Sequence, residues 1–90
     1  MKTVWKYPLK VQEYQEIIMP KDIEFLCVKM QGGTPCLWAL VDDSPDIIVR
    51  TRKIRCAGTG HHIEERYSIY LGTVLMCNGN LVLHYFMEPI

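Results

Sequence analysis

No run in this sequence approaches the roughly eighteen consecutive apolar residues that a membrane helix requires. The opening residues also lack the apolar core of a signal peptide, because Lys2 and Lys6 interrupt them. We therefore expect no membrane partner and a location in the cytoplasm.

An excess of charge of either sign is missing as well. Ten lysines and arginines balance ten aspartates and glutamates, so the formal net charge is zero. No global field would draw the protein to nucleic acid. We expect no nucleic-acid partner, and any anionic ligand must meet a local basic patch.

Paired cysteines are absent. The four cysteines stand singly at Cys27, Cys36, Cys56 and Cys77, whereas zinc sites usually take ligands at C-x-x-C spacing. Two disulfides are the alternative for a secreted chain, but the missing signal peptide favours reduced thiols. We expect buried free cysteines and no metal site.

Catalytic signatures are also lacking. There is no Gly-x-Ser-x-Gly elbow and no phosphate-binding loop ending in Gly-Lys-Ser/Thr. The nearest approach to a metal or acid–base cluster consists of His61, His62, His84, Glu64 and Glu65. Adjacent histidines on an extended chain point to opposite sides, so His61 and His62 cannot easily share one ion. We expect no catalytic residues, no cofactor and no enzymatic activity. The alternative, which ranks behind the two binding functions given at the end of this section, is a metal-dependent hydrolase that uses the three histidines.

The 90 residues do contain ample apolar surface, because 49% of them are hydrophobic against only six glycines and five prolines. This composition excludes a disordered chain and predicts one domain over residues 1–90. No window of helical length carries an i, i+3, i+4 apolar stripe. Short apolar runs predict strands instead, at residues 5–9, 12–19, 23–31, 36–41, 47–57, 68–77 and 81–87. Residues 63–67 fit a helical turn or a loop equally well.

We therefore predict an all-β fold: a small antiparallel β-sandwich or a partly open barrel of six to seven strands. The first strand should lie at a sheet edge, because Pro8 cannot donate to a ladder. Asn78-Gly79 predicts a C-terminal hairpin with a two-residue type I′ turn, since both central residues of that turn need positive φ.

Several predicted strands are apolar on both faces. The run 36–41 is apolar at six successive positions, and the second face of 81–87 carries Val82, His84 and Phe86. Burying one Leu or Phe is worth roughly 1.5–3 kcal/mol, so we expect the second face to meet another copy of the chain. The alternative is a tightly curled barrel in which loops cover these residues.

A basic strand leads into a glycine-bordered loop. Arg50, Arg52, Lys53 and Arg55 precede Gly58-Thr59-Gly60-His61, in which the glycines permit backbone angles that other residues avoid. Loop N–H groups, a threonine hydroxyl and an arginine fork suit a phosphate. In a regular strand, however, Arg52 lies on the face opposite Lys53 and Arg55. The alternative is a solvated strand whose arginines pair with acidic side chains.

The predicted ligand is a phosphate-bearing small molecule, whose base would stack on aromatic rings near the basic loop. The predicted ligand-binding residues are Arg52, Arg55, Thr59, His61, Tyr67 and Tyr70.

Five segments in order resemble a family of small phage and prophage proteins of uncharacterised function. They are residues 5–9 (WKYPL), residues 33–42 (GTPCLWALVD), residues 58–61 (GTGH), residues 70–73 (YLGT) and residues 84–86 (HYF). The resemblance spans nearly the whole chain and implies a viral accessory protein in the host cytoplasm. It brings no catalytic residues.

Small phage proteins that assemble and enclose a ligand resemble counter-defence proteins that sequester nucleotide immune signals, an analogy of size and origin. Our first hypothesis is such a homo-oligomeric, non-enzymatic binding protein. The alternative is a protein-interaction module that blocks a host protein directly through its apolar sheet face.

Overall fold

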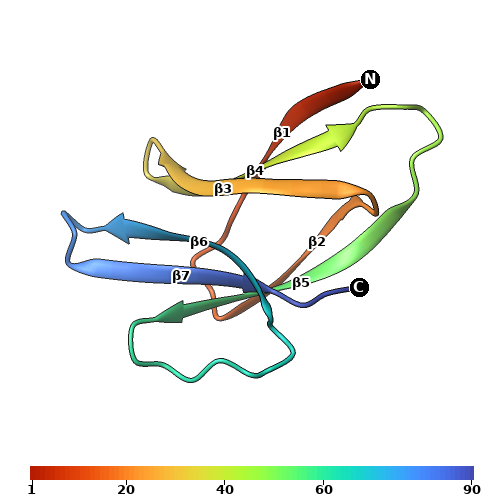
Figure 1. Ribbon diagram of the computed structural model, residues 1–90. Helices are drawn as coiled ribbons and strands as arrows, with labels where there is room; N and C mark the ends of the chain where they lie inside the picture. Colours follow the sequence, from red (N-terminus) through yellow and green to blue (C-terminus); the bar gives the residue numbers. More distant parts are fainter.

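The computed structural model describes residues 1–90 and contains seven antiparallel strands in two sheets, with no helix (Figure 1). The strands are β1 (Lys2–Pro8), β2 (Tyr14–Pro20), β3 (Ile23–Gln31), β4 (Thr34–Asp42), β5 (Val49–Gly58), β6 (Ile69–Met76) and β7 (Leu81–Met87). One sheet has the order β1-β4-β3 and the other β2-β5-β7-β6. The predicted all-β fold is therefore confirmed.

The first two strands each lie at an edge of their sheet. β1 ends at Pro8 and β2 at Pro20, and a proline at a sheet edge leaves no ladder bond unmade. The predicted edge position of the first strand is confirmed.

The core lies between the two sheets and follows from the alternation of side chains along each strand. Leu37 of β4 and Val28 of β3 face Ile54 of β5 and Tyr85 and Met87 of β7, and all five belong to one buried cluster. Leu37, Ile54, Tyr85 and Met87 are completely buried. This side of the four-stranded sheet is its inner face, and the opposite side is called the outer face below.

β3 and β6 lie against each other, although they belong to different sheets. They come close together at Gly72, where an added Cβ would stand 2.8 Å from the Val28 Cβ. Both strands are irregular, with shifts of register between Phe25 and Cys27 and between Tyr70 and Gly72. The sandwich is thus closed along this side by side-chain packing.

The hairpin between β6 and β7 is present, but its turn differs from the predicted type. Met76 and Leu81 form the last pair, so the loop has four residues rather than two. Cys77, Asn78 and Gly79 all have positive φ, at 54°, 56° and 84°. Backbone bonds from Gly79 N to Met76 O and from Asn80 N to Cys77 O (both 3.1 Å) close the loop. Asn78-Gly79 supplied the expected left-handed residues, with Cys77 as an unexpected third.

All four cysteines are free. Cys36 and Cys56 are buried as expected, and burial raises the pKa of the Cys56 thiol. Cys77 is exposed, because it lies in the hairpin loop instead of a strand. No helix that could span a membrane is present.

Candidate binding surface

The two arginines predicted to bind one ligand lie on opposite faces of β5. Arg55 pairs with Tyr14 of β2 and with Phe86 of β7, on the outer face, whereas Arg52 pairs with Ile17, which packs against the core. Side chains of a strand alternate between its faces, so residues three positions apart point in opposite directions. Arg52 and Arg55 therefore do not converge on one ligand.

Arg55 is only 6% exposed and is held by the loop that follows β5. Its Nε donates to Glu64 Oε1 (3.3 Å), its Nη2 donates to His62 O (3.0 Å) and its Nη1 donates to Cys56 O. The guanidinium also lies 4.9 Å from the centre of the Tyr14 ring. Each of its three nitrogens thus has a protein acceptor, and its role is to fix the loop.

Residues 63–67 form a loop with one turn, closed by Tyr67 N donating to Glu64 O (3.0 Å). Glu64 also accepts from Tyr14 OH (2.7 Å), and this hydrogen bond is the main cause that lowers the pKa of the Glu64 carboxyl. Tyr67 is 5% exposed, beside the Tyr14 ring and under Arg66. Tyr67 therefore presents no free stacking surface, contrary to its predicted role, because the loop folds back over β5.

Thr59 and Tyr70 belong to one row of hydrogen-bonded side chains on the outer face. Thr59 Oγ1 lies 2.8 Å from His84 Nε2, Thr73 Oγ1 lies 3.0 Å from His84 Nδ1, and the Tyr70 hydroxyl bonds to Thr73 Oγ1. We call these four residues the hydroxyl–imidazole row. Sequence reasoning missed Thr73 as a site residue, and it considered His84 for a metal or acid–base cluster and for the second face of the last strand, but not for this row. The hairpin register that pairs Thr73 with His84 is the signal that would have found them.

The glycine-bordered loop is closed on itself. Gly60 has φ of +90°, as expected, but the Gly58 N–H donates to His61 Nδ1 (3.3 Å) rather than pointing outward. A Cβ at Gly58 would stand 3.1 Å from His61 Cε1, so this glycine makes room for the imidazole. The predicted cradle of free backbone N–H groups is therefore incomplete. Thr59 and His61 instead border a shallow hollow of about 310 Å³ together with Asn80, Leu81 and Val82.

The far end of the row carries an exposed aromatic surface. Tyr70 is 58% exposed and tilts against the Phe86 ring, with 5.3 Å between the ring centres. Of the predicted stacking residues, Tyr70 is thus available and Tyr67 is not.

The family described as "Domain of unknown function (DUF7352)" matches residues 1–90. The chain belongs to the DUF7352 family. No curated protein and no solved structure shows detectable similarity to it. The expected membership of an uncharacterised family is confirmed.

Arg52 of the DUF7352 chain lies at a separate cleft of about 180 Å³, between the start of β5 and residues 88–90. It is 5% exposed, and its guanidinium lies 5.3 Å from the centre of the Phe25 ring on the opposite sheet. This cleft is on the inner side of β5, away from the hydroxyl–imidazole row.

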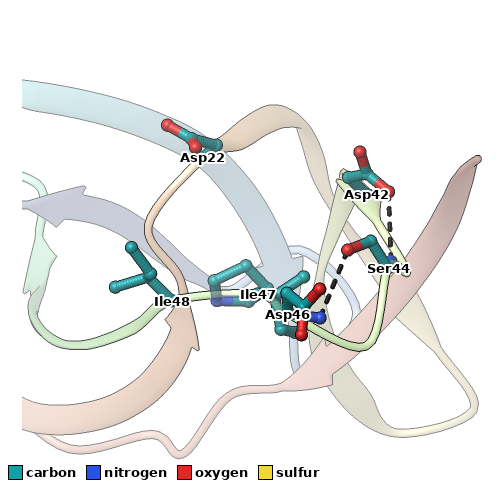
Figure 2. A pocket seen from close by; sticks show the side chains of 7 residues that line it. Asp22, Asp42, Ser44, Asp46, Ile47 and Ile48 are labelled. Atoms are coloured by element: carbon teal, nitrogen blue, oxygen red, sulfur yellow. Dashed lines mark hydrogen bonds between the residues drawn. The ribbon is translucent and has the colours of Figure 1, made fainter.

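Another cleft of the DUF7352 chain, about 170 Å³ in volume, is acidic (Figure 2). Asp42 Oδ1 accepts from Ser44 N (3.1 Å), Ser44 Oγ accepts from Asp46 N (3.3 Å), and Asp22 stands across the opening. The amino group of Met1 donates to Asp42 (3.2 Å), which lowers the pKa of the Asp42 carboxyl. The carboxylates that line this cleft repel anions. No group of three or more histidine, cysteine or acidic side chains in the chain is arranged to hold a metal ion.

Proposed function

We propose that this DUF7352 protein is a non-enzymatic binding protein for a nucleotide-type, phosphate-bearing small molecule on the outer face of its four-stranded sheet. The observation that carries the proposal is the hydroxyl–imidazole row, which joins an exposed aromatic pair to a hollow bordered by Thr59 and His61. A base stacks on Tyr70, and the phosphate meets Thr59 and His61, while His84 holds the Thr59 hydroxyl in place. The hollow is at the lower end of the size of small-molecule sites, about 300–1,000 Å³.

Self-association is part of the proposal. The same outer face carries Tyr14, Ile18 and Leu75, which are 47%, 65% and 61% exposed. Tyr14 and Ile18 lie on β2 and Leu75 lies on β6, at the two edges of this sheet, and exposed apolar surface commonly marks an interface. A second copy seated on them would cover the row and deepen its hollow into a shared pocket.

In finer terms, we propose a phage-encoded counter-defence protein that sequesters a nucleotide immune signal in the host cytoplasm. The support for this assignment is the resemblance of five ordered segments to small phage proteins, together with the small single domain.

Calorimetry at low salt against cyclic dinucleotides and ADP-ribose derivatives tests the ligand. We expect Thr59→Val and Tyr70→Ala each to weaken binding about tenfold, the effect of losing one hydrogen bond to a charged group or one stacking contact. Thr34→Val is the matched control, an exposed threonine on the other sheet, and should bind as the parent does. No binding across the panel would refute the proposal.

A second candidate function, direct contact with a host protein, is favoured by the outer side of the three-stranded sheet. Val4 and Leu26 are 52% and 46% exposed there, and Trp38 and Leu40 of β4 are only partly covered. This candidate predicts that a stoichiometric protein co-purifies, that Val4→Lys abolishes its capture and that the nucleotide panel shows no binding. Retention of the partner by Val4→Lys would exclude this surface.

A further inference from the structure

Arg52 is a buried cation whose hydrogen-bonding capacity the protein does not fill. Its Nε is buried and has no partner. Its one hydrogen bond is from Nη2 to the main-chain oxygen of Glu88, at a long 3.4 Å. A buried charge normally takes a counter-ion and hydrogen bonds, because desolvation of an isolated ion costs several kcal/mol.

No carboxylate of the chain serves as that counter-ion. None of the ion pairs within 4.0 Å includes Arg52. Glu88 also lines the cleft, but its carboxylate oxygen Oε2 lies 4.0 Å from Arg66 Nε and forms no pair with Arg52. Burial without compensation lowers the pKa of the Arg52 guanidinium.

The surroundings of Arg52 define what could fill the cleft. Two further cationic residues line it, Arg50 on the same face of β5 as Arg52 and Lys53 on the opposite face, against one acidic residue, Glu88. Both cationic side chains are exposed and have no ion pair within 4.0 Å. Arg50 and Arg52 on one face of β5 direct two cations toward the opening, which favours an anion, and an arginine fork matches the oxygens of a phosphate.

The size of the cleft sets a second limit. Its volume is about 180 Å³, below the roughly 300 Å³ at which sites for whole drug-sized ligands begin. The cleft therefore suits one phosphate group, with the remainder of any larger molecule outside it.

We propose that this cleft binds a phosphate group, with Arg52 Nε as the buried donor and Arg50 as the flanking cation. The group is inorganic phosphate or the terminal phosphate of a small ester. The site lies on the inner side of β5 and shares no residue with the hydroxyl–imidazole row, so it stands independently of the function proposed above.

The test is calorimetric titration of the full chain at constant ionic strength with inorganic phosphate, glycerol 3-phosphate and acetate. We expect phosphate to bind and acetate to bind at least about tenfold more weakly, as the loss of one charge-assisted contact would give. If glycerol 3-phosphate binds, the cleft accepts the phosphate group of an ester. If only inorganic phosphate binds, the ligand is the free ion.

Two variants assign the binding to this cleft. Arg52→Lys keeps the charge but removes Nε and the planar fork, and we expect it to weaken phosphate binding at least about tenfold. Arg50→Gln alters only an exposed side chain, so it should fold normally and also weaken binding. Lys29→Gln on β3 is the charge-matched control, because it also removes one exposed cation, and it should bind phosphate as the parent does. Equal binding of acetate and phosphate, or unchanged affinity in both cleft variants, would overturn the proposal.

Discussion

Arg52 and Arg55 lie three residues apart on β5 and are almost equally buried, at 5% and 6% exposure, yet their surroundings differ completely. Arg55 has a carboxylate, two main-chain oxygens and an aromatic ring. Arg52 has an aromatic ring and one long hydrogen bond. Burial alone therefore does not distinguish a structural arginine from a ligand-binding one. The distinguishing feature is how many hydrogen-bond acceptors and counter-ions the chain itself supplies to the guanidinium.

The largest effect expected is that of Arg55→Ala. The buried main-chain oxygen of Cys56 and the partly buried one of His62 lose their donor, and each unsatisfied buried group costs about 1–3 kcal/mol. We expect the free energy of unfolding to fall by about 3 kcal/mol, measured by urea denaturation. A decrease of less than about 0.5 kcal/mol is the usual effect of a surface substitution. Such a result would show that the partners of Arg55 do not stabilise the fold, and the two arginines would then not differ in role.

A smaller effect, with a characteristic pH dependence, is expected for Glu64→Gln. The folded-state pKa of Glu64 is lowered, chiefly by the hydrogen bond from Tyr14, so ionised Glu64 stabilises the fold above its unfolded value of 4.5. This stabilisation is lost as the pH falls through the lowered folded pKa. Glu64→Gln should thus be less stable than the parent at pH 7, and the two unfolding curves should converge on acidification. A constant difference at every pH would contradict the role given to this carboxylate.

Arg52→Met is expected to change stability in the opposite direction. An apolar chain of similar length removes an uncompensated buried charge, and such replacements are neutral or stabilising by about 1–4 kcal/mol. We expect a gain of about 1 kcal/mol in phosphate-free urea denaturation. A loss similar to that of Arg55→Ala would show that Arg52 already has all the partners it needs.

The smallest effect on folding is expected for Tyr70→Ala. This side chain is 58% exposed and contributes little to the core, so the free energy of unfolding should change by no more than about 0.5 kcal/mol. The same variant should bind the nucleotide about tenfold more weakly, which separates the exposed row from the buried arginines. A large loss of stability would place Tyr70 among the structural residues instead.

Local pattern was sufficient to predict the strands. Alternation and turn residues placed all seven within a few residues, because each strand depends mainly on its own side chains and its neighbouring turns. Alternation also placed Arg52 and Arg55 on opposite faces, as β5 shows.

The roles of individual residues depend on contacts between distant parts of the chain, which pattern does not encode. The loop after β5 could have lain on either side of the strand. Only the contacts of Glu64 and His62 with Arg55 show that it covers the outer face and buries Tyr67. Likewise, Thr59 meets His84 across 25 residues of sequence through the pairing of β5 with β7. The sequence pattern identified His84 as a candidate, but it did not show that Thr59 and Thr73 are its hydrogen-bond partners.

At Gly72 the missing side chain allows β6 to approach β3 of the other sheet closely. The strands there come close enough that even one methyl group would stand 2.8 Å from Val28 Cβ, well inside van der Waals contact. Any larger residue at this position would push β6 away from β3. The two sheets would separate along this side, and water would reach the core. The close contact between β3 and β6 therefore depends on Gly72 having only a hydrogen atom in place of a side chain.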